Sequence, residues 1–234
     1  MRTPRTRGAG GSVVMMCGLP ASGKTTTAGR LYAHAGGVLV RSCDVYADLG
    51  INLPAWVVRT RGFTVDVGEY DRVRDRAYEE IARRLQRSLS GGGLVILDAV
   101  YGERPKRDAV YDLCHARDAD VTLLHCRCDD GGEIARRLGR RRGREVVPEH
   151  EASDRSIFRD IARRWQDPRT DELPDGGVPV IVTIDTLREP PRVRGPGRLV
   201  ARRYRSKRAD ISRRARRDSL VTGFALPPPR HPSE

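Results

Sequence analysis

The chain has 234 residues, 38% of them hydrophobic, a size that suits one globular domain with its own core plus extensions. The net charge of +13 lies at the ends: residues 188–234 contribute +10 and residues 1–11 contribute +3, so residues 12–187 are neutral and the basicity does not mark the body of the chain as a nucleic-acid-binding face. No apolar run approaches the roughly 18–20 residues of a membrane-spanning helix, so we expect no membrane partner.

Residues 1–11 are polar and basic with several glycines, which predicts a disordered lead-in. The apolar run Val13–Cys17 predicts a buried strand that leads directly into a glycine-rich loop. The loop matches the phosphate-loop pattern G-x-x-x-x-G-K-[ST] at every fixed position. Its expected ATP-binding residues are Gly18, Leu19, Pro20, Ala21, Ser22, Gly23, Lys24 and Thr25, with Thr26 following.

Each of these residue types has a physical role in holding ATP. Terminal glycines let successive backbone N–H groups point inward as an anion-binding nest. Lys24 is then expected to reach the β- and γ-phosphates as a catalytic residue, and the Thr25 hydroxyl to ligate Mg²⁺. A helix predicted over Thr25–His34 adds the positive end of its dipole. The alternative is a chance Gly/Ser turn.

A second strand is expected over Gly37–Ser42, followed by Asp44. Functional residues of open α/β sheets gather at the carboxyl ends of strands, so Asp44 is the candidate base and substrate-binding carboxylate. The alternative role for Asp44 is a helix cap or a turn residue. Residues 45–68 look irregular and too long for an ordinary connection, which predicts an acceptor-binding or mobile segment.

A long helix is expected over Glu69–Ser90, ended by three glycines. The third strand, Leu94–Asp98, closes on an acid in the manner of a Walker B element, so Asp98 is the second candidate Mg²⁺ ligand. A simple turn acid is the alternative role for Asp98. A further helix over Pro105–Arg117 and a fourth strand over Val121–Cys126 follow.

The helix expected over Gly132–Arg144 is rich in arginine. Guanidinium forks suit phosphate oxygens, so this segment is expected to form a lid over ATP, with Arg137 and Arg141 as its candidate catalytic residues. The alternative is a solvated basic helix face. Six arginines fall there: Arg136, Arg137, Arg140, Arg141, Arg142 and Arg144.

The remaining elements complete an α/β pattern. A helix is expected over Ser153–Trp165 and a last strand over Val178–Ile184. Strands alternating with helices predict a doubly wound parallel sheet covered by helices on both faces, over residues 12–187. Residues 188–234 are read as a basic, mostly disordered tail. The five scattered cysteines fit no common zinc spacing and suit a reducing cytoplasm.

Taken in order, four pieces resemble the small P-loop kinases that include zeta toxins, polynucleotide kinases and chloramphenicol phosphotransferases. They are Cys17–Thr25, Ser42-Cys43-Asp44, Gly93–Ala99 and Arg137–Arg141, and Val182–Thr186 resembles the closing strand of that group. The resemblance implies a five-stranded core, an arginine-rich lid, and an ATP- and Mg²⁺-dependent kinase acting on a hydroxyl. It also makes Arg107 a candidate substrate-binding residue, with a surface helix arginine as the alternative.

Three functions follow from this reading. The first is a kinase that phosphorylates a hydroxyl of a small molecule. The second is a polynucleotide or RNA 5′-hydroxyl kinase tethered to nucleic acid by the basic tail. Ala47 stands where many members of the group carry an arginine that handles the substrate phosphate, which weighs against this second reading. The third is a non-catalytic, regulatory module that binds a nucleoside triphosphate.

Overall fold

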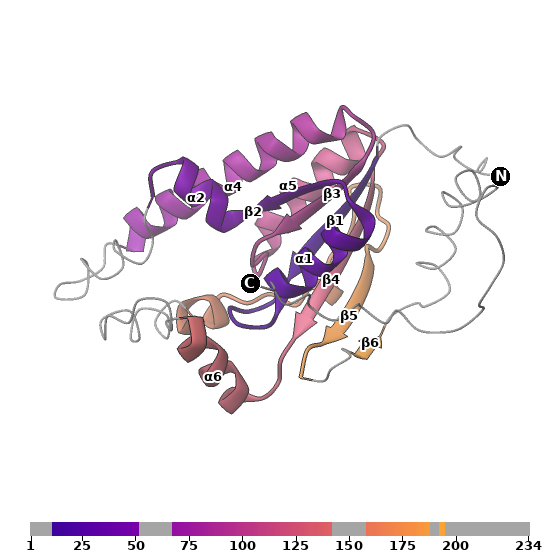
Figure 1. Cartoon of the computed structure of the whole chain (residues 1–234). Coiled ribbons are helices and arrows are strands. Elements are labelled where there is room, and N and C mark those ends of the chain that lie inside the picture. Colours follow the sequence, from indigo (N-terminus) through magenta and orange to yellow (C-terminus); the bar gives the residue numbers. More distant parts are fainter. Residues whose placement is uncertain (1–10, 52–66, 142–157, 188–191, 195–234) are drawn as a thin grey trace, which may run out of the picture.

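The computed structural model describes residues 11–51, 67–141, 158–187 and 192–194 (Figure 1). Most of the predicted lead-in (residues 1–11), of the 45–68 segment and of the predicted tail (residues 188–234) lies outside this part of the chain. Within the described residues, no helix combines the length and the apolar character needed to cross a bilayer.

One six-stranded sheet forms the centre of the fold, in the order β2-β3-β1-β4-β5-β6. The first five strands are parallel, and β6 runs antiparallel to β5. The five parallel strands confirm the predicted doubly wound α/β fold. In chain order the strands are β1 (Ser12–Cys17), β2 (Val38–Arg41), β3 (Leu94–Asp98), β4 (Asp120–Arg127), β5 (Val180–Asp185) and β6 (Arg192–Arg194).

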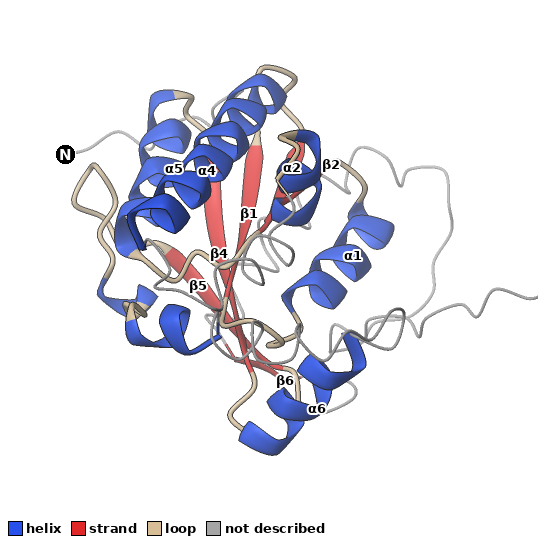
Figure 2. Cartoon of the chain, turned by 90° about the vertical axis from the view of Figure 1, so that its left-hand side faces the viewer, coloured by secondary structure: helices blue, strands red, loops and turns tan. Residues whose placement is uncertain are grey.

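Helices cover both faces of the sheet (Figure 2). Helices α4 and α5 lie on one face and α1 lies on the other, whereas α6 follows the carboxyl end of β4. A further helical segment occupies 158–163. The bounds are α1 (Lys24–Ala35), α2 (Ser42–Asp48), α4 (Val67–Leu89), α5 (Arg104–Ala116), α6 (Gly131–Arg141) and a 3-10 turn η1 (Pro168–Thr170).

Alternation along β1 divides the core into two halves, because successive side chains of a strand point to opposite faces. Val13 and Met15 pack with the apolar stripes of α4 and α5, while Val14 and Met16 pack with α1. All four side chains are buried. Since β1 is buried on both faces, the sequence shows it as a continuous apolar run rather than an alternating one. The phosphate loop follows directly from this rigid strand.

Two elements differ from the sequence-based expectation. Residues 42–48 form α2, where an irregular segment was expected to begin at residue 45. The apolar residues Val45 and Leu49 hold this helix on the core that α4 also covers, and packing of this kind overrides weak local propensity. Strand β6 lies beyond Leu187, inside the segment read as a tail, because its three residues form a ladder on the outer edge of β5.

Candidate active site

The loop between β1 and α1 has the backbone shape of an anion nest. Ala21 and Gly23 have positive φ values of 61° and 86°, and the Ser22 N–H donates to the Leu19 carbonyl at 3.1 Å. Lys24 folds back over the loop and its Nζ donates to the same carbonyl at 2.8 Å. Among the residues that the structure describes, no side chain makes a capping hydrogen bond at the start of α1. The loop therefore directs the positive end of the helix into its own concavity.

The packing around Gly18 and Gly23 leaves little room for a side chain at either position. A Cβ on Gly18 would lie 2.4 Å from the Cys126 carbonyl oxygen, and one on Gly23 would lie 3.1 Å from Cγ2 of Thr186. The Ser22 hydroxyl is buried and has no hydrogen-bond partner within the described residues. A cradle built of glycine backbone, with an unsatisfied hydroxyl and a lysine, fits the phosphates of a nucleotide.

The structure brings four predicted site residues to one cavity. Pro20, Lys24, Thr25 and Asp98 all line a space of about 300 Å³ at the carboxyl edge of the sheet. Asp98 is the last residue of β3 and is 4% exposed. A hydroxyl and a carboxylate facing the same space are the hard oxygen donors that Mg²⁺ prefers, so these two side chains fit the ion. Both would hold it beside the phosphates.

Part of the remaining cavity wall comes from helix α4, which the sequence did not connect to the site, whereas Tyr46 lies in the 45–68 segment predicted to bind the acceptor. Helix α4 contributes two tyrosines and an arginine, the chain between β3 and α5 contributes Glu103, and α5 contributes Lys106. The cavity therefore extends from the phosphate loop to a mixed polar and aromatic wall. The lining residues are Pro20, Lys24, Thr25, Ser42, Tyr46, Tyr70, Arg74, Tyr78, Asp98, Ala99, Val100, Gly102, Glu103, Lys106, Leu138 and Ile161.

Arg74 is the more buried of the two cations that α4 and α5 contribute to the cavity lining, at 8% exposed. Its Nη1 lies 2.8 Å from Glu103 and its Nη2 lies 3.3 Å from Asp71. Asp71 also accepts from Arg164 at 2.7 Å, which joins α4 to the segment that follows the 158–163 helix. Arg74 was not predicted from the sequence. Its spacing of four residues from both Tyr70 and Tyr78 could have indicated a role, because this spacing places a charged residue on the apolar face of the helix.

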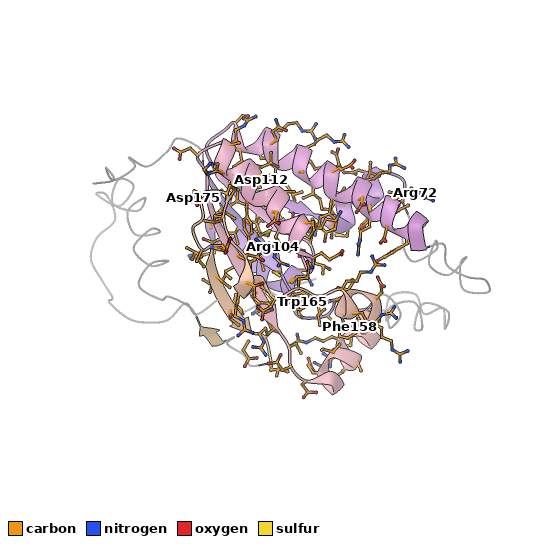
Figure 3. All side chains as sticks on the ribbon, turned by 180° about the vertical axis from the view of Figure 1, so that it is seen from behind. Arg72, Arg104, Asp112, Phe158, Trp165 and Asp175 are labelled. Carbon is orange, nitrogen blue, oxygen red and sulfur yellow. The ribbon has the colours of Figure 1, made fainter. Side chains whose placement is uncertain are left out.

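Trp165 and Gln166 attach the segment after the 158–163 helix to Gly102, in the connection between β3 and α5. The Trp165 ring lies against Gly102, where an added Cβ would approach within 3.1 Å, and it stacks on His125 at 5.5 Å between centroids. The Gln166 N–H donates to the Gly102 carbonyl at 2.8 Å. In Figure 3 the short helix that carries Phe158 lies opposite the end of α4 that carries Arg72. Ile161 of this helix lines the cavity, and Arg164, which follows the helix, contacts Asp71 of α4.

Arg137 reaches the phosphate loop from α6, as the predicted arginine-rich segment requires. Its guanidinium donates to the Ala21 carbonyl at 3.2 Å and to the Thr186 carbonyl at 2.6 Å, and its Nε lies 2.6 Å from Glu133. The Thr186 hydroxyl also donates to the Ser22 carbonyl at 2.9 Å. The guanidinium therefore ties the loop to the end of β5. Its catalytic role stays a prediction.

Arg107 occupies the core rather than the cavity wall. Its guanidinium is 0% exposed and makes a bidentate pair with Asp171 at 2.6 and 2.7 Å. The remaining Nη1 donates to the Tyr101 carbonyl at 3.0 Å, and the Tyr111 hydroxyl donates to Asp171 at 2.8 Å. Because every nitrogen of its guanidinium is engaged inside the protein, Arg107 supports the β3–α5 connection and is not available to bind a substrate.

Asp44 lies in the first turn of α2, after β2 has ended at Arg41. Its carboxylate accepts from Arg41 Nε at 2.7 Å and lines a separate depression beside β2, with Arg84 and Arg87. The structure therefore does not bring Asp44 to the cavity that holds Lys24 and Asp98. Its predicted role as base requires the carboxylate to leave Arg41.

Two predicted lid arginines, Arg142 and Arg144, lie outside the described residues. Arg141 ends α6, and its side chain also falls outside them. Thr26 is exposed in the first turn of α1. Arg136 pairs with Glu133, and hydrogen bonds from Arg136 and Arg137 lower the pKa of that carboxyl to about 2. Part of the arginine-rich helix is thus a solvated, ion-paired face, which is the alternative to a lid over ATP.

Comparison with known proteins places this geometry in a family. A family model described as an AAA domain matches residues 13–168, which include the phosphate loop and Asp98. Among curated proteins, no sequence matches the chain. A solved structure described as a candidate kinase from Chloroflexus aurantiacus is similar at 17% identity and a TM-score of 0.54, over 86% of this chain and 97% of that one.

Two further solved structures are similar at lower TM-scores. A gluconokinase from Sinorhizobium meliloti has 18% identity and a TM-score of 0.46, over 88% of this chain and 95% of its own. Kti12 from Chaetomium thermophilum, in complex with ADP-AlF3, has 22% identity and a TM-score of 0.46, over 67% and 81%. At such identities the similarity concerns the P-loop kinase-like fold alone. The function has to be inferred from the residues of the site.

Proposed function

The chain belongs to this AAA-domain family, and from that premise we propose that it is a kinase that transfers the γ-phosphoryl group of ATP to a hydroxyl of a small molecule. The observation that carries the proposal is the single cavity in which Lys24, Thr25 and Asp98 meet a wall of polar side chains from α4 and α5. A phosphate cradle alone binds a nucleotide, whereas a cavity continuous with it offers room for an acceptor.

Each site residue has its own role in the proposed phosphoryl transfer. Lys24 and the loop N–H groups hold the phosphates, and Thr25 with Asp98 would hold Mg²⁺. Bound Mg²⁺ supplies positive charge that neutralises the phosphate oxygens. The acceptor oxygen forms a bond to the γ-phosphorus while the bond from that phosphorus to the β,γ-bridging oxygen breaks, and ADP leaves. The hydroxyl proton passes to a carboxylate and then to solvent.

Two carboxylates compete for the role of base. Asp98 lines the cavity, whereas Asp44, the base predicted from sequence, is 2.7 Å from Arg41 outside it. Substituting each in turn by asparagine separates the roles. If Asp44→Asn alone abolishes transfer while Mg²⁺-ATP binding is unchanged, Asp44 is the base. If transfer survives that change and fails with Asp98→Asn although Mg²⁺-ATP binding is unchanged, Asp98 acts as the base rather than as the Mg²⁺ ligand.

The first experiment measures Mg²⁺-ATP binding and ATP consumption with acceptor panels. We expect Lys24→Ala to lose both, whereas His34→Ala, at the exposed end of the same helix, keeps both. Panels of small hydroxyl compounds and of 5′-hydroxyl RNA and DNA ends run in parallel. Labelling of nucleic-acid ends alone would contradict the proposal. Binding of ATP without transfer to any acceptor would favour a non-catalytic module.

A further inference from the structure

Two side chains hold the phosphate loop from elements that lie far from it in the sequence. Thr186 directly follows the last residue of β5, and Arg137 lies in the second half of α6. Neither is among the residues that line the cavity beside Lys24 and Thr25. Both side chains contact the loop through its backbone carbonyls instead.

Two consecutive carbonyls of the loop receive these contacts. The Ala21 carbonyl accepts from Arg137 Nη1 at 3.2 Å, and the Ser22 carbonyl accepts from the Thr186 hydroxyl at 2.9 Å. Ala21 has a φ of 61°, a backbone conformation that costs free energy in any residue other than glycine. A strained residue of this kind keeps its conformation only where its surroundings hold it, and here Arg137 does so.

Peptide geometry connects these contacts to phosphate binding. In a trans peptide group the C=O and the following N–H point in opposite directions. The hydrogen bond that holds the Ser22 carbonyl toward Thr186 therefore turns the Gly23 N–H away from Thr186. The N–H groups of such a loop are the donors that bind phosphate oxygens. Thr186 thus fixes the direction of one of these donors.

Thr186 is well suited to this role because the sheet holds it rigidly. Its N–H donates to the Arg127 carbonyl at 3.0 Å, which extends the pairing of β4 with β5 by one residue. Its hydroxyl has two carbonyl neighbours, Ser22 at 2.9 Å and Arg127 at 3.0 Å, and the shorter contact is to the loop. Its side chain also packs against Gly23, where an added Cβ would lie 3.1 Å from Cγ2.

The Arg137 guanidinium uses all three of its nitrogens within this arrangement. Nε lies 2.6 Å from Glu133, and Nη2 donates to the Thr186 carbonyl at 2.6 Å. Nη1 donates to the Thr186 hydroxyl oxygen at 3.0 Å as well as to the Ala21 carbonyl. To contact a transferring phosphate, Arg137 would have to release the loop that binds the nucleotide.

We propose that Arg137 and Thr186 are positioning residues that together set the affinity of the loop for nucleotide, and that Arg137 does not contact the transferring phosphate. This role differs from the catalytic one that the sequence predicts for Arg137. The inference rests on the nucleotide binding that the proposed function requires, and it does not depend on the identity of the acceptor.

The first test measures the Kd for ADP by calorimetry, with the full-length chain and no acceptor. Thr186→Val replaces the hydroxyl by a methyl group of similar size, so we expect the Kd to rise about three- to tenfold, the effect of losing roughly one hydrogen bond. Thr186→Ser keeps the hydroxyl and should bind ADP as the wild type does. An unchanged Kd in Thr186→Val would overturn the inference.

Thr170→Val is the matched control for the loss of a hydroxyl. The Thr170 hydroxyl donates to the Asp167 carbonyl at 2.8 Å in η1, so this variant loses the same kind of bond on another element. Both valine variants should lower the unfolding temperature of the unliganded chain, whereas only Thr186→Val should weaken ADP binding. Equal weakening of ADP binding in both variants would reflect a general loss of stability and would refute the positioning role.

Kinetics distinguish a positioning Arg137 from a catalytic one. Arg137→Lys keeps the charge and loses the fork that joins the loop to Thr186. We expect the Kd for ADP and the KM for ATP to rise together about tenfold, while kcat at saturating ATP changes less than about threefold. A fall in kcat of about a hundredfold or more with an unchanged Kd for ADP would assign Arg137 to the transition state and overturn the inference. Arg136→Lys is the matched control, because Arg136 pairs with the same Glu133 from the same helix, and it should leave these constants unchanged.

The double variant Arg137→Lys/Thr186→Val tests whether the two side chains act as one unit. Because they hold adjacent carbonyls and contact each other, we expect its Kd for ADP to match that of the weaker-binding single variant. A Kd raised by the product of the two single effects would mean independent contacts and would overturn the joint role. A chain that binds ADP as expected here but phosphorylates no acceptor would contradict only the kinase function.

Discussion

Replacing Asp171 by asparagine should destabilise the fold more than any surface change of the same kind. Asp171 holds the fully buried Arg107 with bonds of 2.6 and 2.7 Å and also accepts from the Tyr111 hydroxyl at 2.8 Å. Asparagine removes the negative charge and one of the two acceptor oxygens, so the guanidinium stays buried without its counter-ion. Breaking a buried pair in this way costs about 3–5 kcal/mol.

That loss is a large fraction of the roughly 5–15 kcal/mol by which domains of this size are stable. Urea unfolding followed by circular dichroism measures it as a lower midpoint with an unchanged slope. In thermal unfolding the expected shift is on the order of 6–20 °C, from about 2–4 °C per kcal/mol for chains of this length. The nucleotide site should still form in native conditions, because Lys24 and Thr25 lie on another element.

Asp108→Asn is the matched control on the same helix as Arg107. Asp108 lies 3.5 Å from Arg104, and both side chains are 40% exposed. An exposed pair of this kind contributes less than about 1 kcal/mol. If Asp171→Asn also cost less than about 1 kcal/mol, water would have to reach the guanidinium, and our account of Arg107 as a buried support for the β3–α5 connection would be refuted.

Three further predictions concern pH, thiols and the loop. Burial lowers the pKa of His125 to about 4, so between about pH 6.5 and pH 4 the unfolded chain binds a proton that the folded chain does not. The free energy of unfolding should therefore fall as the pH drops from about 6.5 toward 4. In His125→Gln, the urea midpoint should vary less over this range. Cys43 is the one exposed cysteine, and burial raises the pKa of Cys17 to about 12, so a thiol reagent should modify one thiol in the folded chain and five after denaturation. Rapid labelling of a second thiol in the folded chain would contradict that packing. Gly23→Ala should weaken ATP binding at least about tenfold by calorimetry, because φ is 86° and the Thr186 side chain is close, whereas Gly29→Ala, in open space on α1, should leave the affinity unchanged.

The local sequence pattern was sufficient to predict the five parallel strands and the phosphate loop. The apolar runs at Val13–Cys17 and Leu94–Asp98 predicted two central strands, and the loop between β1 and α1 predicted the nest that the backbone forms. Each of these depends on residues adjacent in the sequence. Asp98 could be placed beside Lys24 because parallel strands end at a common edge.

The cavity wall formed by α4 and the start of α5 could not be predicted in the same way. It joins Arg74 of α4 to Glu103 near the start of α5, and these residues meet only through tertiary packing. The sequence also could not distinguish a carboxylate that faces the cavity from one that faces away. Asp44 follows a strand as expected, yet an arginine three residues earlier, Arg41, binds it at the edge of the sheet. Arg107 shows the same limit, since its partner Asp171 lies 64 residues away.

Strand β6 has a consequence for self-association. The parallel sheet would otherwise end at β5, whose outer N–H and C=O groups would form an open template for pairing with another chain. Arg192–Arg194 covers part of that edge with a strand too short and too charged to recruit a neighbour. A fragment cut at Leu187, where the composition changes, would lose this cover and should oligomerise, whereas one cut after Arg194 should remain monodisperse.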